Sequence, residues 1–485
     1  MRQFDVIIIG GGIGGLVAGS LLADAGLSVF LLEQHGVVGG CASTFARRAY
    51  AFESGATLGF GFHKEGPMDW LGVQLDIKWP VIKQPVVWEY RSGKYSIPLT
   101  ADRRKLIQIF PQSRKFWKKQ ATIADSLWYV TSNVLAQYRK SRTKQLSALI
   151  KQLFSQCINP ELVRHTAEST ATWLKRHNLD GDLDFRQFID AQLFVSAQTI
   201  SQDANALFSA LALDLPRKSP CTLVGGMGSI ARKLSGAIQK RGGRVHLNEK
   251  VLNLTVKNNH IHNVVTEHGT YSCRQVVYNG SDATLAPLLG KVVPGSWRKL
   301  NRSMWGAFIL HLGVDESVFA GRNSRYLQLM HPGGSSLAEG GSLFLSLSDP
   351  GDLSRAPAGK MAVTVSTHTE VNQWWQALQK GRKSYEALKK EYIEKIVGTM
   401  VHYLGDCRDS IDFCLAGTPV TYARYTGRHL GLVGGYAQTG LFAPRQKRYG
   451  VKNITFVGDY RFPGQSVTGV TVGAAMAADS LLRRM

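Results

Sequence analysis

Cysteine is sparse in this sequence, and its spacing matches no metal-binding or disulfide pattern. Six cysteines are spread over 485 residues, and no two of them form a CxxC pair. Such spacing predicts neither a zinc site nor a disulfide framework, so we expect a reducing compartment. The sequence also lacks the HExxH spacing of a metalloprotease and a recognisable Ser-His-Asp order of a hydrolase. No metal site is therefore predicted.

Long apolar runs are missing as well. One stretch, Val6 to Ala23, has eighteen residues without a charge, close to the length of a membrane span or signal peptide. Six of those residues are glycine, which destabilises an isolated helix. We therefore interpret the stretch as a strand, a turn and a helix, and predict neither a membrane span nor a signal peptide.

Acidic residues are few relative to basic ones. Lys and Arg number 58 against 35 Asp and Glu, which gives a formal net charge of +23. This excess favours an anionic partner, either nucleic acid or an acidic lipid surface, with simple solubility as the alternative. The apolar fraction of 44% is that of a folded protein, and the length suggests two or three folding units.

The first 35 residues have the pattern of a strand, a glycine turn, a helix and a second strand. Residues 4–9 form an apolar run that is followed by Gly10-Gly11-Gly12-Ile13-Gly14-Gly15. In this GxGxxG motif, Gly10 makes the tight turn, Gly12 lets the backbone approach a pyrophosphate, and Gly15 allows close packing of helix on strand. Glu33 ends the second strand, where a carboxylate binds ribose hydroxyls and disfavours a 2′-phosphate. The unit predicts binding of FAD or NAD.

The C-terminus distinguishes between these two cofactors. Residues 455–459 predict a strand that ends in Gly458-Asp459, and we expect a helix to begin near Gly469-Val470. This arrangement resembles the second flavin-binding signature of two-domain FAD oxidoreductases, in which the Asp binds a hydroxyl and the helix N-terminus faces the flavin. Residues 243–251 resemble the strand of that family whose valine, here Val251, holds the adenine through its backbone. These resemblances imply FAD.

The same resemblance implies an α/β fold in two parts. We expect a doubly wound, Rossmann-type FAD-binding domain beside a mixed α+β substrate domain. The nucleotide-binding unit is discontinuous, because its pieces come from both ends and the middle of the chain. We predict that residues 1–66, 219–290 and 447–485 form the FAD-binding domain, and that residues 67–218 and 291–446 form the substrate- and membrane-facing domain.

Further motifs narrow the family. They are Gly39-Gly40, residues 52–57, Gly225 to Gly228, Asp349-Pro350, residues 356–360 and the segment from Thr418 to Gly435. Together they resemble the FAD-dependent superfamily of carotenoid desaturases, carotenoid isomerases and retinol saturases, over nearly the whole chain. Residues 39–45 (GGCASTF) look most like desaturases of the 3′,4′ bond of carotenoids. The resemblance places Gly39, Gly40 and Cys41 in the cofactor site, with Cys41 filling a tight turn rather than acting as a reactive thiol.

The resemblance implies a reaction without identifying catalytic residues. Hydride transfer from a long polyene to flavin needs positioning more than a protein acid or base. We expect a carotenoid desaturase whose substrate lies in an apolar tunnel, with carotenoid isomerisation or saturation as the nearest alternatives. A monoamine-type oxidase and a non-redox prenyl-binding escort protein are more distant alternatives. Relatives of monoamine oxidase usually carry Gly-Gly-Arg where this chain has Gly-Gly-Cys41.

One segment is both basic and aromatic. Residues 101–152 hold twelve Lys or Arg against two Asp, with aromatic and aliphatic side chains between them. Such a segment is typical of interfacial helices on anionic lipid. The alternatives are a groove for single-stranded nucleic acid and a solvated helical face without a partner. We expect a peripheral protein on the cytoplasmic side of a membrane, with no specific nucleic-acid partner. The sequence does not predict the oligomeric state.

Overall fold

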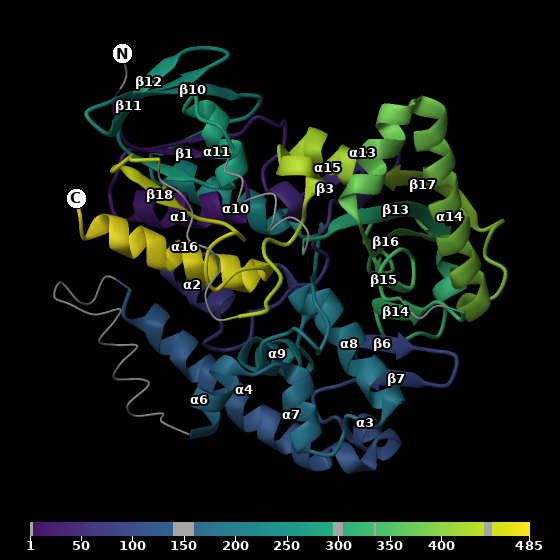
Figure 1. Ribbon diagram of the computed structural model, residues 1–485. Helices are drawn as coiled ribbons and strands as arrows, with labels where there is room; N and C mark the ends of the chain where they lie inside the picture. The colour runs from purple at the N-terminus through teal and green to yellow at the C-terminus, as the bar shows by residue number, and fades with distance from the viewer. Residues whose placement is uncertain (1–2, 139–159, 294–303, 334–335, 441–448) are drawn as a thin grey trace.

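The computed structural model describes residues 3–138, 160–293, 304–333, 336–440 and 449–485. One sheet with its helices occupies one side of the molecule, and a second sheet with two long helices occupies the other (Figure 1). A layer of shorter helices and the long α4 lies beneath them, and both termini lie on the side of the first sheet (Figure 1).

The first sheet contains the glycine motif at the end of its central strand. Its strands are β1 (Gln3–Ile9), β2 (Val29–Leu32), β9 (Arg244–His246), β10 (Val251–Lys257), β11 (His260–Thr266), β12 (Thr270–Tyr278) and β18 (Ile454–Phe456). They run in the order β10-β11-β12-β1-β2-β9, and β18 pairs with the end of β12. Strands β12, β1, β2, β9 and β18 are parallel, whereas β10, β11 and β12 are antiparallel. Val6, Ile7 and Ile8 of β1 are fully buried, as expected of a parallel strand covered on both faces.

Four helices pack with one face of this sheet. They are α1 (Ile13–Asp24), α2 (Pro67–Leu75), α10 (Gly228–Lys240) and α16 (Ser466–Leu482). Their apolar side chains join those of β1 and β2 in one core. Helix α1 is buried along almost its whole length, which explains why its sequence carries no polar face.

The second sheet has seven strands. They are β6 (Trp88–Arg91), β7 (Ser96–Leu99), β13 (Gly306–Asp315), β14 (Tyr326–Met330), β15 (Ser342–Leu347), β16 (Lys360–Thr369) and β17 (Ile411–Gly417). Their order is β17-β13-β16-β15-β14-β6-β7, and all neighbours are antiparallel except β14 and β6.

Helices α13 (Val371–Lys380) and α14 (Arg382–Leu404) cover one face of the second sheet (Figure 1). Phe308, Leu310 and Leu312 of β13 share a core with Trp374 and Ile396 of these helices. Because side chains alternate along a strand, the intervening residues 307, 309 and 311 lie on the opposite face. That face is turned towards the first sheet and lines the cavity described below.

The lower layer is helical and rich in aromatic residues. Its helices are α3 (Arg104–Ile109), α4 (Arg114–Ala136), α6 (Pro160–Ala167), α7 (Thr170–Arg176), α8 (Leu183–Ala197) and α9 (Ala206–Ala212). Phe110, Phe116 and Trp117 are buried in the core of this layer. The expectation that these aromatic side chains lie on a lipid-facing surface is therefore wrong, because neighbouring helices cover them. The basic side chains of α4 remain exposed, and the predicted basic positions from 139 to 151 lie outside the described residues.

The remaining elements connect these parts. They are β3 (Thr44–Arg47), β4 (Tyr50–Glu53), β5 (Val81–Lys83), β8 (Cys221–Leu223), α11 (Asp282–Leu288) and α15 (Pro419–Thr426). The predicted α/β class, with a doubly wound nucleotide-binding part and a mixed second part, is confirmed. The domain boundaries stay a prediction. Within the described residues, no helix combines the length and apolarity that a membrane crossing requires.

Candidate functional site

One continuous cavity of about 1450 Å³ lies between the two sheets. Its walls come from the glycine loop after β1, the end of β2, residues 39–43, the exposed face of the second sheet and the start of α16. Chain segments from both ends of the sequence therefore meet at one site.

The glycine loop opens the N-terminus of α1 to this cavity. Gly10 has φ +99°, and Gly12 is the N-cap of α1, so no side chain caps the first turn. A Cβ at Gly14 would lie 2.7 Å from the backbone nitrogen of Gly458. The glycine loop after β1 and the loop that follows β18, the two cofactor loops, therefore approach each other closely. Gly15 lies behind the loop, where a Cβ would lie 2.1 Å from the carbonyl oxygen of Gly10. The helix dipole at this N-terminus suits a phosphate.

Glu33 lies at the same end of the cavity. Its carboxylate accepts hydrogen bonds from the backbone N–H groups of Gly11, at 2.7 Å, and His35, at 2.8 Å. Burial raises the pKa of Glu33 in spite of these two bonds. The backbone N–H of Glu249 donates to the Glu33 carbonyl at 2.8 Å, and this bond brings Val251 to the cavity wall beside Glu33.

The loop that contains Gly39, Gly40 and Cys41 lies directly beside the glycine motif. The N–H of Gly39 donates to the carbonyl oxygen of Gly11 at 2.8 Å. Gly39 and Gly40 have φ values of +115° and +58°, which favour glycine, and the loop continues into a short 3₁₀ turn over Gly40–Ala42. Burial raises the pKa of the Cys41 thiol, so the thiol stays protonated at neutral pH and suits a packing role.

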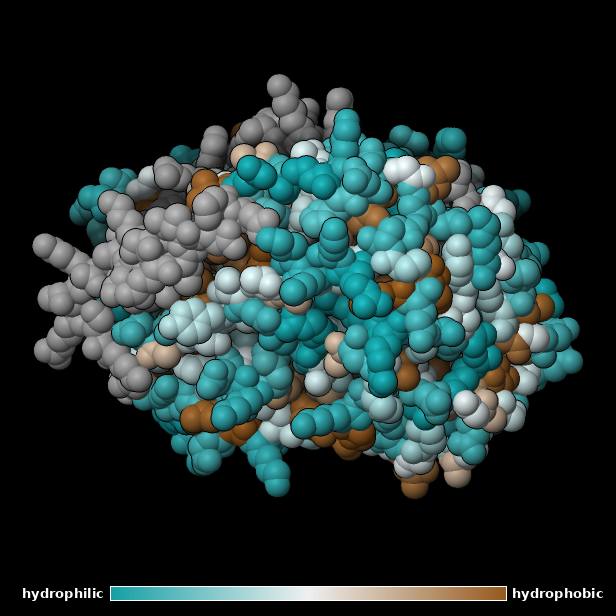
Figure 2. All heavy atoms as spheres, turned by 90° about the horizontal axis from the view of Figure 1, so that it is seen from below, coloured by the Kyte–Doolittle hydropathy of each residue, from teal (hydrophilic) through white to brown (hydrophobic). Residues whose placement is uncertain are grey.

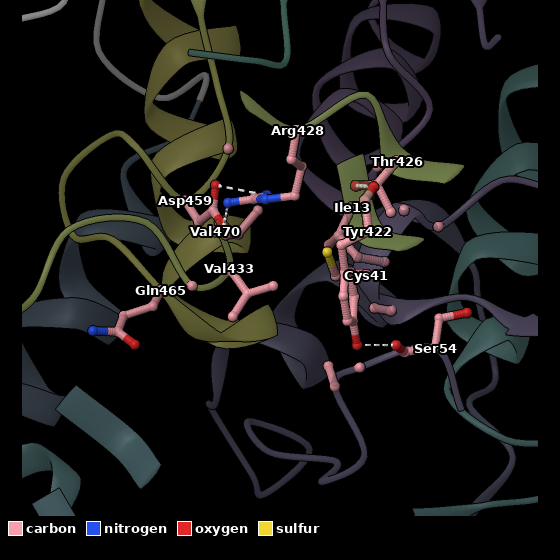
Figure 3. A pocket seen from close by; sticks show the side chains of 18 of the residues that line it. Ile13, Cys41, Ser54, Tyr422, Thr426, Arg428, Val433, Asp459, Gln465 and Val470 are labelled. Atoms are coloured by element: carbon pink, nitrogen blue, oxygen red, sulfur yellow. Dashed lines mark hydrogen bonds and ion pairs between the residues drawn. The ribbon is translucent and has the colours of Figure 1, made fainter. Parts of the chain in front are cut away.

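The second cofactor loop, which follows β18, is joined to the segment after α15 by an ion pair that the sequence motifs do not predict. Asp459 accepts two hydrogen bonds from Arg428, at 2.8 and 3.3 Å, and the guanidinium also lies 5.1 Å from the centre of the Tyr460 ring. Both side chains of the pair line the cavity, and Figure 3 shows the contacts that join Arg428 to Asp459. Burial, the largest single influence, lowers the pKa of Arg428, but the Asp459 carboxylate together with Tyr460 and Cys41 outweighs it, so the pKa is raised.

Helix α16 begins at Ser466, four residues before the predicted start near Val470. The N–H of Gly469 donates to the Ser466 hydroxyl at 3.1 Å, and this turn accounts for the earlier start. Gly469 and Val470 line the cavity from the first turn of the helix. All predicted site residues except Gly15 therefore lie at the cavity wall.

Two further residues of the site were missed. Asn279 follows β12, and its side-chain amide donates to the carbonyl oxygen of Gly10 at 3.3 Å. Tyr422 of α15 donates to the carbonyl oxygen of Ser54, as drawn in Figure 3. Both contacts join residues far apart in the chain, so no local motif signals them.

The half of the cavity away from the glycine loop is largely apolar. Its wall includes Leu58, Phe60, Phe208, Leu211 and Phe344. Two histidines of the second sheet, His311 and His368, interrupt this apolar wall. Burial lowers the pKa of His311 to about 3 and that of His368 to about 4, so both imidazoles are neutral at physiological pH.

The residues at the cavity wall fit an FAD molecule. The uncapped N-terminus of α1 suits the diphosphate, and the Glu33 carboxylate faces the position of a ribose. A Cβ at Gly12, Gly14 or Gly458 would collide with atoms of Asn279 or Gly458, so glycine at these positions lets the loops of the site pack closely. A second helix N-terminus, that of α16, lies at the same cavity.

Sequence comparison agrees with this geometry. The chain is 25% identical over 498 residues to a prolycopene isomerase of Daucus carota, with 98% of this chain and 80% of the relative covered. It is 24% identical over 541 residues to the human all-trans-retinol 13,14-reductase, with 100% and 86% covered. The resemblance to the carotenoid desaturase, isomerase and retinol saturase superfamily is confirmed, whereas the 3′,4′-desaturase assignment stays a prediction.

Solved structures share the fold. An oxidoreductase from Methanosarcina mazei has a TM-score of 0.64 at 15% identity, covering 98% of this chain and 99% of its own. The cyclohexylamine oxidase of Brevibacterium oxydans has a TM-score of 0.63 at 14% identity, covering 100% and 99%. The family model described as "Flavin containing amine oxidoreductase" matches residues 13–482. The chain therefore belongs to the flavin-containing amine oxidoreductase family and is an FAD-dependent oxidoreductase.

Proposed function

We propose that this enzyme desaturates a long polyene of the carotenoid class. The observation that supports the proposal most strongly is the single cavity, which joins the dinucleotide-binding loops to an apolar wall of the second sheet. A substrate rich in CH₂ and CH groups gains roughly 0.8 kcal/mol for each buried CH₂. An apolar wall with few polar groups therefore suits a hydrocarbon chain.

The residues of the chain bind, orient and shield the reactants. The first turn of α1, Glu33 and the Arg428–Asp459 pair would hold FAD at one wall. Ile309 and Phe344 on the opposite sheet form an apolar surface that keeps the polyene close to that wall. FAD, when bound, would supply the hydride acceptor. The substrate would lose a hydride from a carbon next to the polyene and a proton, to water, from the adjacent carbon, and a C=C bond would form between them.

Isomerisation is the second candidate function. It is favoured by the likeness to a protein named prolycopene isomerase, which covers 98% of this chain. Saturation is supported in the same way by the relative named all-trans-retinol 13,14-reductase. The three reactions use the same cavity and differ in the mass of the product.

Product analysis in a carotene-accumulating host tests the proposal. Expression of the enzyme should yield a carotenoid that is two hydrogens lighter and absorbs further to the red. A product of unchanged mass would instead assign the enzyme to the isomerases, and a product two hydrogens heavier would assign it to the saturases. The Gly14→Ala variant, in which the two cofactor loops cannot close, serves as the inactive control.

We also propose that the substrate is collected at an acidic lipid surface. The lower face of the molecule, which carries α3, α4 and α7, is mainly hydrophilic with small apolar patches (Figure 2). Lys118 and Lys119 of α4 are exposed on the side opposite the buried aromatic residues. Each Lys near an anionic membrane contributes about 1 kcal/mol to binding.

Flotation with liposomes tests this surface. Lys118→Gln with Lys119→Gln should weaken binding to acidic liposomes roughly tenfold or more, since two Lys together contribute about 2 kcal/mol. Lys383→Gln with Lys390→Gln removes two exposed charges from α14 and should leave binding nearly unchanged. Equal flotation of both double variants, or equal binding to neutral and acidic liposomes, would contradict the proposed surface.

A further inference from the structure

The cavity face of the second sheet carries few polar side chains, and most of them are already satisfied. The Ser342 hydroxyl accepts a hydrogen bond from Gln328 at 3.3 Å. The Ser366 hydroxyl donates to the carbonyl oxygen of Phe344 at 3.4 Å. Both serine hydroxyls are therefore hydrogen-bonded within the sheet. The two imidazoles are the polar groups that remain to be considered.

His311 is part of the wall rather than a group presented to a ligand. Its side chain is only 5% exposed and packs against the rings of Phe45, at 5.1 Å, and Phe52, at 5.2 Å. Its Nδ1 atom has no hydrogen-bond partner among the described residues, but this atom is itself buried.

His368 differs from His311 in its exposure to the cavity. It is half-buried on β16 and lines the cavity. Its ring packs on one side against Phe194, at 4.5 Å, and the Trp305 ring lies next to Phe194, 6.4 Å from the imidazole. Within the described part of the chain, no hydrogen bond to either ring nitrogen is found. The contact with Phe194 restricts how the imidazole can turn.

A polar group in an apolar wall requires a partner. An unsatisfied donor or acceptor that loses water costs free energy, so buried polar groups are normally hydrogen-bonded. A neutral imidazole offers one N–H donor and one nitrogen acceptor. Because burial keeps His368 neutral, it suits an uncharged oxygen, a hydroxyl or a carbonyl. A carboxylate would prefer a cation, and an ammonium would prefer a carboxylate.

The sheet register separates the two histidines. His368 of β16 pairs with Ala307 of β13, and His311 lies four residues after Ala307 on β13. At about 3.3 Å for each residue, the two positions are about 13 Å apart. One oxygen atom cannot reach both imidazoles, so each would act alone.

We propose that His368 is a specificity residue that hydrogen-bonds a hydroxyl or carbonyl oxygen carried by the polyene ligand. The inference rests on the proposed function, since it assumes that the apolar half of the cavity holds a polyene. It adds that the preferred ligand carries an oxygen atom at the position opposite β16.

Direct binding of a matched pair of probes tests the inference. The probes are retinol and the hydrocarbon in which its hydroxyl is replaced by hydrogen, and the readout is quenching of tryptophan fluorescence in the FAD-loaded enzyme. The unaltered enzyme should bind the alcohol roughly three- to tenfold more tightly, as one neutral hydrogen bond allows. His368→Phe keeps the ring volume and should abolish this preference, whereas His368→Gln keeps a donor and an acceptor and should retain part of it.

His311→Phe is the matched control. It removes an equally neutral imidazole from the same sheet face and should leave the preference unchanged. The inference is overturned if the unaltered enzyme does not favour the alcohol, if His368→Phe keeps the preference, or if the preference is lost only in His311→Phe. Loss of FAD from His368→Phe would also overturn it, because the imidazole would then serve the cofactor. A preference that depends on His368 in an enzyme that leaves polyenes chemically unchanged would refute the proposed function alone.

Discussion

Replacing Arg428 with glutamine tests how the second cofactor loop is held. In the structure the Arg428 guanidinium donates two hydrogen bonds to Asp459, at 2.8 and 3.3 Å, and a third to the carbonyl oxygen of Leu432. The Arg428→Gln substitution removes the positive charge and shortens the side chain. Asp459 then keeps a carboxylate at the cavity wall without its cation.

The expected loss follows from the burial of the pair. The two side chains are only 16% and 19% exposed. Removing one partner of a buried ion pair costs about 3 to 5 kcal/mol, because the other charge is left uncompensated. Both side chains retain some contact with the cavity, so we expect a loss near the lower end, about 3 kcal/mol in the free energy of unfolding. FAD affinity should fall as well, since Asp459 lies in the cofactor loop.

A double-mutant cycle separates this effect from a direct role of Arg428. Asp459→Asn removes the charge that Arg428 compensates, so adding Arg428→Gln to it should cost much less than in the unaltered protein. Urea unfolding of the apo-protein measures stability, and fluorescence titration with FAD measures affinity. Additive losses in the double variant, within about 0.5 kcal/mol, would refute the coupling and show that Arg428 acts independently of Asp459.

Three further perturbations have expected outcomes. Gly14→Ala should yield a protein without FAD, because the new Cβ would lie 2.7 Å from the Gly458 nitrogen; the flavin absorbance of the purified protein checks this. Gly236→Ala is its control: no atom lies within 4 Å of the new Cβ, so this variant should stabilise α10 by about 0.5–1 kcal/mol, as unfolding curves would show. Glu33→Ala should lower FAD occupancy of the purified protein, and normal occupancy would contradict its assignment to the ribose. Burial lowers the pKa of His368 from 6.5 to about 4. Between pH 6.5 and about pH 4 the folded state therefore binds fewer protons than the unfolded state, so the free energy of unfolding should fall as the pH falls through this range. His368→Phe should reduce this acid loss by up to about 1.4 kcal/mol per pH unit, as measured by unfolding at several pH values.

The cofactor end of the site was predictable because its residues obey local rules. Gly10, Gly12 and Gly15 follow one another in a single turn, and Glu33 ends the next strand. Each role follows from spacing along the chain, so the sequence alone indicates the phosphate and ribose positions. The structure places these residues at one cavity or, for Gly15, directly behind it.

The contacts between distant segments were not predictable in this way. Arg428 reaches Asp459 across 31 residues of sequence, and Asn279 reaches Gly10 across 269. Such pairs depend on which strands become neighbours and how their loops come together, as β12 and β1 do at Asn279 and Gly10, and no local spacing encodes this. Arg428 does fall inside the segment from Thr418 to Gly435 that resembles the superfamily, and that was the one available signal.

The aromatic residues of α4 show a second limit. The sequence pattern predicts that α4 has an apolar face, but it does not reveal what covers Phe116 and Trp117. In the structure, aromatic side chains of α7 and α8, including Trp173 and Phe185, pack against them. The break between α13 and α14 is equally hard to place from an amphipathic pattern. Gly381, at φ +120°, separates the two helices.

The most direct test of the central claim is a single turnover without oxygen. Purified enzyme with oxidised FAD is mixed with carotene in acidic liposomes, and the flavin spectrum and the mass of the carotenoid are followed together. The account predicts that the yellow flavin colour is lost in step with a product that is two hydrogens lighter and absorbs further to the red. A flavin that stays oxidised beside a carotenoid of unchanged mass would contradict it.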